Sequence, residues 1–159
     1  MSLISIRDAR PDEALELEAL QRRSSDVWDD DRALLAEHPN LIVPPHEAIA
    51  AGGVRVAVDA SGRRLGFAIV LPVRKGRCEL DDLFVEPDSM GQGIGRLLVA
   101  DALARARAAG ADVVDVIANP NAVGFYERLG FEVIGEAATR FGSSPRMTLE
   151  LCRTAERDA

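Results

Sequence analysis

The chain has 159 residues, of which 47% are hydrophobic, 28% charged and 4% aromatic, a balance that excludes a disordered acidic tail. The net charge of -7 disfavours nucleic acid as a partner and suits a cationic ligand, although such a charge also serves solubility alone. No apolar run approaches the roughly 18 residues of a membrane span, and the start lacks a basic, apolar leader. We therefore expect a cytoplasmic protein without a membrane partner.

The first third of the chain carries one strand signal and two helix signals. Residues 3–7 alternate as in a short strand, and a proline followed by two acids begins an apolar helical stripe over 11–23. A second short helix is expected over 30–37, and three prolines within 39–45 prevent a regular element directly after it. Because no repeat or low-complexity linker divides the sequence, we expect one domain spanning 1–159.

The middle of the chain is rich in strand signals. Segments 55–59, 64–73 and 78–85 are separated by turns at Gly62 and Gly76. These connections are too short for parallel crossovers, so the three segments are expected to form an antiparallel meander.

The last part returns to alternating helices and strands. A helix is expected over 93–109, an apolar strand that is central and buried over 112–118, and a short helix over 121–129. Two final strands are expected over 131–134 and 146–151. The whole pattern predicts an α/β fold with a mixed sheet.

Cysteine and histidine are too sparse to indicate a metal site. Cys78 and Cys152 form no CxxC pair and are expected to be reduced, apolar strand residues. His38 and His46 lie eight residues apart without an HExxH spacing. The sequence therefore predicts no bound metal.

The most informative segment joins a strand to a helix through alternating glycines at positions 91, 93 and 95. Glycine permits positive φ, and the first amides of a helix have no partner inside it, so such a loop can hold a phosphate. A tight turn without a ligand is the alternative. The loop lacks the lysine and Ser/Thr of a P-loop, and its glycines do not have the spacing of a dinucleotide-binding Rossmann loop.

A second segment follows the expected strand over 112–118. Asn119 leaves that strand with a side-chain amide free to bind, and Phe125 and Tyr126 lie in the following short helix. Gly130 ends the helix and Phe131 begins the next strand. Core packing is the alternative for Phe125, and a partly buried ring with a satisfied hydroxyl is the alternative for Tyr126.

Together, in this order, the two segments resemble the GNAT superfamily of acetyl-CoA-dependent N-acetyltransferases. The signature Gln/Arg-x-x-Gly-x-Gly/Ala is matched at Gly93 and Gly95, with Met90 where Arg or Gln is usual, and Asn-x-x-Ala-x-x-Phe-Tyr-x-x-x-Gly-Phe is matched throughout. The resemblance is strong over 78–131 and weak over 30–53. It implies the GNAT-like fold, a mixed, mostly antiparallel central sheet flanked by helices.

The resemblance implies acetyl-CoA as the cosubstrate, without a metal. Its pantetheine arm would pair with the backbone of Leu83, Phe84 and Val85, whose amides would stabilise charge on the thioester oxygen. Asn119 would bond to the same arm, and Phe125 would pack against the cofactor. Main-chain amides would hold the pyrophosphate, and these belong to Gly91, Gln92, Gly93, Ile94, Gly95 and Arg96.

The resemblance also implies the acid and base of the reaction. Tyr126 matches the tyrosine that protonates the departing thiolate in many relatives, with a purely positional role as the alternative. Glu79 and Asp81 share one face of their strand and are the candidate bases, whereas Asp82 points the other way. Solvated or arginine-paired carboxylates are the alternative. Trp28, followed by three aspartates, is suited to a cationic acceptor or simply to a helix start.

The expected function is transfer of an acetyl group from acetyl-CoA to a primary amine by direct attack, with a small cationic amine as acceptor. A protein N-terminal or lysine acetyltransferase is one alternative, and a non-catalytic acyl-CoA-binding or regulatory module is another. A nucleotide-binding domain is disfavoured by the loop spacing. A homodimer is left open by analogy with relatives that dimerise.

Overall fold

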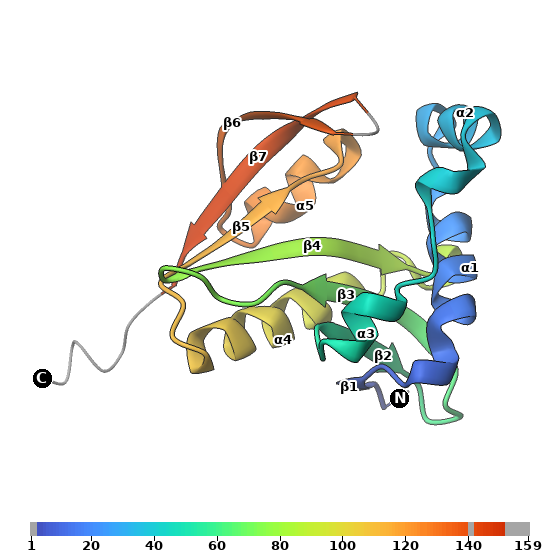
Figure 1. Ribbon diagram of the computed structural model, residues 1–159, viewed down its shortest axis with the longest axis horizontal. Helices are drawn as coiled ribbons and strands as arrows, with labels where there is room; N and C mark the ends of the chain where they lie inside the picture. Colours follow the sequence, from blue (N-terminus) through green and yellow to red (C-terminus); the bar gives the residue numbers. More distant parts are fainter. Residues whose placement is uncertain (1–2, 140–141, 152–159) are drawn as a thin grey trace, which may run out of the picture. The chain divides into compact units, whose positions relative to one another are not determined.

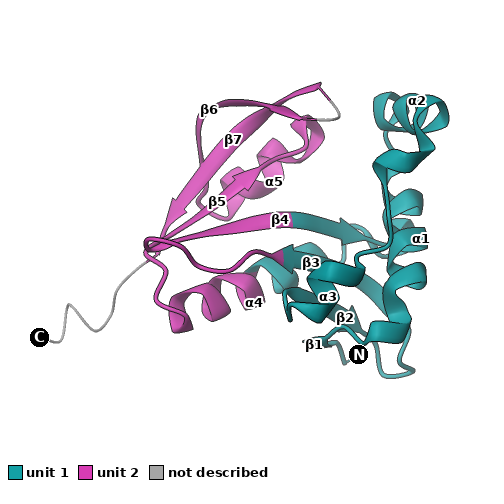
Figure 2. Cartoon of the chain, viewed as in Figure 1, with its two compact units in different colours: residues 1–69, 82–99 teal, residues 70–81, 100–159 magenta. Residues whose placement is uncertain are grey.

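The computed structural model describes residues 3–139 and 142–151 (Figure 1). The chain divides into two compact units, one with residues 1–69 and 82–99 and the other with residues 70–81 and 100–159 (Figure 2). Strand β4 (Arg77–Val85) and helix α4 (Ile94–Ala108) each run through both units. Because one strand and one helix contribute residues to both units, we propose that the chain forms a single domain.

The first unit contains the amino-terminal strands and the helices between them. Its elements before β4, in chain order, are β1 (Ser5–Asp8), η1 (Pro11–Glu13), α1 (Ala14–Ser25), α2 (Asp29–Glu37), η2 (Pro39–Leu41), α3 (His46–Ala50), β2 (Val54–Val58) and β3 (Arg64–Val70). Strands β1 and β2 pair antiparallel, as do β2 and β3, and β4 follows β3 in the sheet. The expected strand order β2, β3, β4 is confirmed.

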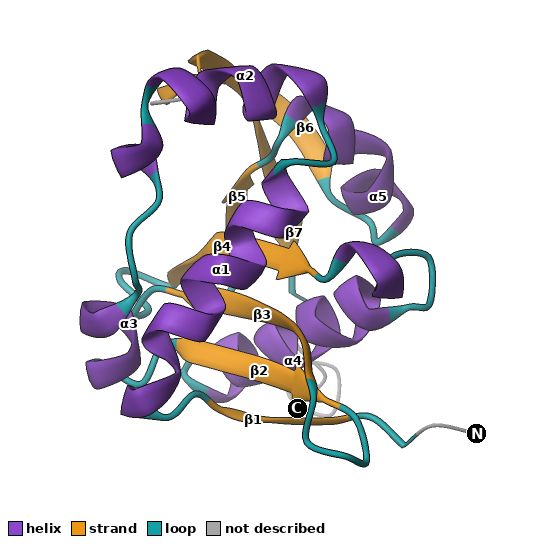
Figure 3. Cartoon of the chain, turned by 90° about the vertical axis from the view of Figure 1, so that its right-hand side faces the viewer, coloured by secondary structure: helices purple, strands orange, loops and turns teal. Residues whose placement is uncertain are grey.

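The apolar stripe of α1 makes the core of the first unit, over β2 and β3 (Figure 3). Leu17 and Leu20 are buried in one cluster with Phe67 and the valines of β2. Gly66 on β3 lets a neighbouring strand and a helix approach closely, because a Cβ there would lie 2.7 Å from the carbonyl oxygen of Phe84 and 3.2 Å from the side chain of Leu98. This close approach brings the beginning of α4 against β3.

The second unit contains the remaining parts of β4 and α4 and the carboxyl-terminal elements. These elements are β5 (Val113–Ile117), η4 (Pro120–Ala122), α5 (Val123–Arg128), β6 (Glu132–Thr139) and β7 (Gly142–Glu150). Strand β5 pairs parallel with β4 and antiparallel with β7, which pairs antiparallel with β6. The strand order is β1-β2-β3-β4-β5-β7-β6, so the mixed, mostly antiparallel sheet is confirmed.

Several expectations about individual elements differ from the structure. Strand β5 is central in the sheet, between β4 and β7, as expected. Only its face with Val114 and Val116 is buried, and the face that carries Asp115 is half-buried, so the expectation of a buried strand holds for one face alone. Helix α3 was not expected among the prolines, yet it begins directly after Pro45, as proline favours. Strand β3 ends at Val70, before the expected end at 73. Strand β6 continues to Thr139, past the expected end at 134, and β7 begins at Gly142, before the expected start at 146.

The expectations about cysteines, metal binding and membrane spans can be compared with the described part of the chain. Cys78 is buried on β4 as a free thiol, and burial raises its pKa, whereas Cys152 lies outside the described residues. Within 3–139 and 142–151, no three His, Cys, Asp or Glu side chains gather in a group able to hold a metal ion. Over the same residues, no helix has the length and apolar character needed to cross a bilayer.

Candidate functional site

The glycine loop of the first unit leads from β4 into α4. A short turn, η3 (Pro87–Ser89), follows the strand, and Gly91 and Gly93 then adopt φ of +80° and +84°. A Cβ at either position would meet no atom within 4 Å, so the loop surface is open. The bond from the Leu97 amide to the Gly93 carbonyl, at 3.1 Å, starts the helix. The amides of the first turn therefore lack partners inside the helix, as an anion-binding loop requires.

Met90 stands at the position where the signature carries Arg or Gln. It lies just before the glycines and is 36% exposed. Its side chain supplies no charge, so an anion held at this loop depends on the main chain.

The end of β4 extends beyond its registered pairs with β5. The parallel register with β5 extends from Arg77 only to Leu80. On the opposite side, the amide following β4, that of Glu86, donates to the Leu65 carbonyl of β3 at 2.8 Å. The segment Leu83–Val85 thus lies beyond the registered pairs with β5, which is the condition for adding an extended ligand to a strand.

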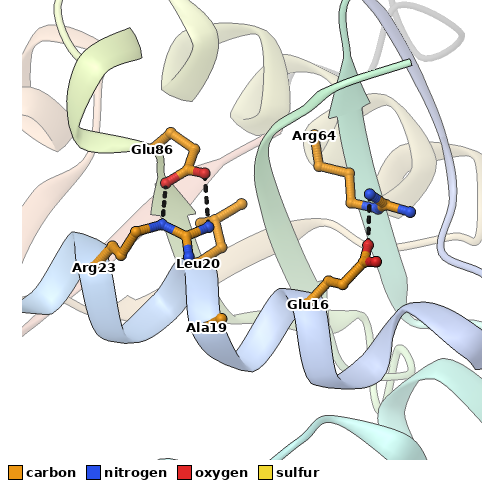
Figure 4. A pocket seen from close by; sticks show the side chains of 6 residues that line it. All are labelled: Glu16, Ala19, Leu20, Arg23, Arg64 and Glu86. Carbon is orange, nitrogen blue, oxygen red and sulfur yellow. Dashed lines mark hydrogen bonds and ion pairs between the residues drawn. The ribbon is translucent and has the colours of Figure 1, made fainter.

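A hollow of about 200 Å³ lies in the first unit beside α1 (Figure 4). Arg23 of α1 donates two hydrogen bonds of 2.8 Å to the carboxylate of Glu86, and Arg64 pairs with Glu16. The charges of these side chains neutralise one another. The two ion pairs connect α1 to β3 and to the residue that follows β4. Because Arg23 and Glu86 lie 63 positions apart, no local pattern could have predicted this pair.

The tyrosine of the second signature lies in the second unit, on α5. The ring of Tyr126 is 5% exposed and meets Phe125 and Phe131 edge-on, with centroids 5.0 Å and 5.4 Å away. Phe125 itself is only half-buried, so it is not a core residue. The aromatic contacts fix the tyrosine ring without using its hydroxyl.

Asn119 has a structural task that the sequence analysis missed. Its side-chain oxygen accepts a hydrogen bond of 2.9 Å from the Asn121 amide and so caps the turn η4. The expectation of a free side-chain amide is therefore wrong, because the oxygen half of this amide is already bonded.

The two candidate bases lie on the same face of β4, as the period of two predicts. Glu79 is half-buried and Asp81 is exposed, while Cys78 and Leu80, which alternate with them, point into the core. Burial, with the charges of Asp81 and Asp115, raises the pKa of Glu79, and Arg146 opposes this rise. Partial desolvation of the carboxylate raises the pKa of Asp81 as well, although the residue as a whole is exposed.

Asp115 belongs to the same polar face and was missed by the sequence analysis. The parallel register places it directly beside Glu79. Its carboxylate accepts hydrogen bonds of 2.9 and 2.7 Å from Arg77 and one of 2.9 Å from Thr148. Its signal was present, since Asp115 is the single charged residue in the apolar strand Val113–Ile117.

Trp28 is 37% exposed and occupies the position before α2. The three aspartates after it form the first turn of that helix, where negative charge is favoured by the helix dipole. One of them, Asp29, also pairs with Arg32. The helix start therefore accounts for these acids.

Comparison with known proteins decides the family. The model of the Acetyltransferase (GNAT) family matches residues 13–131. The chain belongs to this family. The expected family, enzyme class and fold are thereby confirmed, and the matched range includes both the glycine loop and the tyrosine segment.

Individual relatives of this GNAT chain support the assignment. The peptidyl-lysine N-acetyltransferase YjaB of Salmonella typhimurium is 34% identical over 137 residues, 85% of this chain and 88% of the relative. The solution structure of apo YjaB from Escherichia coli is 29% identical, with a TM-score of 0.66 over 93% of this chain and 97% of that one. The structure of the PaiA N-acetyltransferase of Thermoplasma acidophilum in complex with coenzyme A has a TM-score of 0.76 and is 18% identical in sequence. The match covers 94% of this chain and 99% of that one, and it shows a similar fold.

Proposed function

We propose that this protein transfers an acetyl group from acetyl-CoA to the primary amine of a lysine side chain in a polypeptide. The glycine loop supports the donor: it has two open glycines of positive φ, and the first amides of α4 have no acceptor inside the helix. The names of the YjaB relatives support lysine as the acceptor. The small cationic amine expected from the sequence is the second acceptor to test, because its ammonium group has the same chemistry.

The residues present suit acetyl-CoA. The loop amides of residues 91–96 would hold its pyrophosphate, and the backbone of Leu83–Val85 would pair with its pantetheine arm. Asn119 would bond to the same arm, and Phe125 would pack against the cofactor. When bound, acetyl-CoA supplies an acetyl group that is already activated as a thioester.

The chain itself has to move two protons. An alkylammonium has a pKa of about 10.4, so the acceptor must lose a proton before its nitrogen can attack. We assign this proton to Glu79, because its side chain is less exposed to solvent than that of Asp81 and two other carboxylates, Asp81 and Asp115, lie near it. As the C–N bond forms and the C–S bond breaks, Tyr126 donates its hydroxyl proton to the departing sulfur and regains one from water.

The first prediction concerns the loop. Gly93→Ala places a Cβ at φ +84°, which costs about 1 kcal/mol and displaces the amides, so the Kd for acetyl-CoA rises about tenfold. Gly62→Ala is the matched control, since Gly62 has φ +86° in an exposed turn with equal open space. Calorimetric titration of both variants should show weaker binding only for Gly93→Ala; equal Kd values would contradict the assignment of the loop.

The second prediction separates the two carboxylates. Glu79→Gln lowers kcat with a lysine peptide about a hundredfold at neutral pH, because the amine loses its proton acceptor. Asp81→Asn keeps kcat within about threefold, since its carboxylate is exposed and not the proton acceptor. Thiol release with saturating acetyl-CoA measures both. A larger loss for Asp81→Asn than for Glu79→Gln would transfer the role to Asp81.

A further inference from the structure

We propose that Asp115, fixed by Arg77 and Thr148, is a positioning residue for the transfer: it holds a negative charge directly beside Glu79 and thereby keeps Glu79 an effective proton acceptor. This inference rests on the proposed function, because it assumes that Glu79 takes the proton of the amine. It adds a residue of the neighbouring strand to the two carboxylates of β4.

The geometry of three adjacent strands carries the inference. Glu79 on β4 and Asp115 on β5 are partners in the parallel register, so their side chains project from the same face at neighbouring positions. Asp115 is in turn the registered partner of Thr148 on β7. Thr148 and the two nitrogens of Arg77 hold the carboxylate from two sides. The charge beside Glu79 therefore has a fixed place.

The carboxylate of Glu79, unlike that of Asp115, is not held by hydrogen bonds from the described residues. Among the described residues no hydrogen bond or ion pair engages its carboxylate, although it is half-buried. The groups that face it within the second unit are Arg77 and Asp81 on β4, Asp115 on β5 and Arg146 on β7. On the other side of β4, the neighbour of its backbone is the apolar Leu71. Negative neighbours favour the protonated form, so they make Glu79 a stronger base.

The two ends of the Arg77–Asp115 pair make a sharp test. Asp115→Asn removes the negative charge and leaves Arg77 positive, so Glu79 releases its proton more easily. Arg77→Gln removes the positive charge and leaves Asp115 uncompensated, so Glu79 holds its proton more strongly. A merely structural role would make both variants fail in the same way, because both break one ion pair. Thr148→Val removes one hydrogen bond to Asp115 but leaves both charges in place, so it separates the loss of this bond from the loss of a charge.

The experiment measures the titration of Glu79 directly and through catalysis. Carbon NMR of glutamate-labelled protein, assigned with Glu79→Gln, gives the carboxyl midpoint in each variant. The acid limb of kcat/KM for a lysine peptide reports the same group in the free enzyme. We expect both to move down by about half a pH unit in Asp115→Asn, up by a similar amount in Arg77→Gln, and little in Thr148→Val.

Each outcome decides the inference. Opposite shifts in both measurements support it, while shifts in the same direction, or none, overturn it. An NMR midpoint that moves without the acid limb of kcat/KM also overturns it, because Asp115 would then act on a carboxylate outside the reaction. If the wild-type protein transfers acetyl to no amine, the proposed function fails, and the NMR titration still decides whether Asp115 controls the charge of Glu79.

Discussion

Replacing Tyr126 by phenylalanine lowers kcat about a hundredfold while the Kd for acetyl-CoA stays within about twofold. The ring remains, together with its edge contacts to Phe125 and Phe131, so only the hydroxyl is lost. Without it the sulfur must leave as a thiolate or take its proton from water, and this affects the bond-breaking step rather than binding. Thiol release under saturating substrates gives kcat, and calorimetry gives Kd.

The stability of this variant is the control. Tyr126 is buried and its ring contacts are kept, so Tyr126→Phe is expected to lose no more than about 1 kcal/mol of unfolding free energy and to remain folded. A kcat close to that of the wild type would assign Tyr126 the positional role instead. Parallel losses of kcat and of acetyl-CoA binding would indicate that the ring has moved.

The largest effect on stability is expected at Glu13. Its side chain is 1% exposed and accepts two hydrogen bonds from Arg7, at 2.7 and 2.8 Å, and one from the Arg10 amide at 2.7 Å. Arg64 donates to the same carboxylate. Glu13→Gln leaves these donors without their charge partner, so the free energy of unfolding should fall by about 3 kcal/mol. Urea unfolding measures the loss.

Glu16 offers a matched control on the neighbouring helix. It pairs with the same Arg64, but its side chain is 56% exposed. Glu16→Gln should therefore cost less than about 1 kcal/mol. Similar losses for the two variants would show that burial of the Glu13 carboxylate does not decide its contribution.

The Glu13 network also makes stability depend on pH. Hydrogen bonds from Arg7, opposed by burial and reinforced by Arg10 and Arg64, lower the pKa of Glu13 below its ordinary value. A group with a lowered folded pKa stabilises the protein above its unfolded pKa, about 4.3, and this contribution is lost as the pH falls toward the folded value. Unfolding free energy should thus decrease below about pH 4.3, and less steeply in Glu13→Gln.

The regular elements were largely predictable because their signals are local. The proline and acids before α1, the glycine turns of the meander and the period of two in β4 act over a few residues. The glycine loop and the tyrosine segment are likewise continuous stretches, and together they identified the family. Prediction failed where local signals conflicted. The prolines concealed the helical signal of α3, and the apolar neighbours of Asp115 concealed the half-buried polar face of β5.

What the sequence determined by itself is therefore the order of the elements, the family and the segments that carry the proposed cofactor site. The tertiary structure decided which charges meet. Arg64 reaches Glu13 across 51 positions and Arg77 reaches Asp115 across 38, and strand pairing alone places Glu79 beside Asp115. The physical reason is that strand registry and burial bring together carboxylates and arginines that are far apart along the chain, and proximity then sets their charge states.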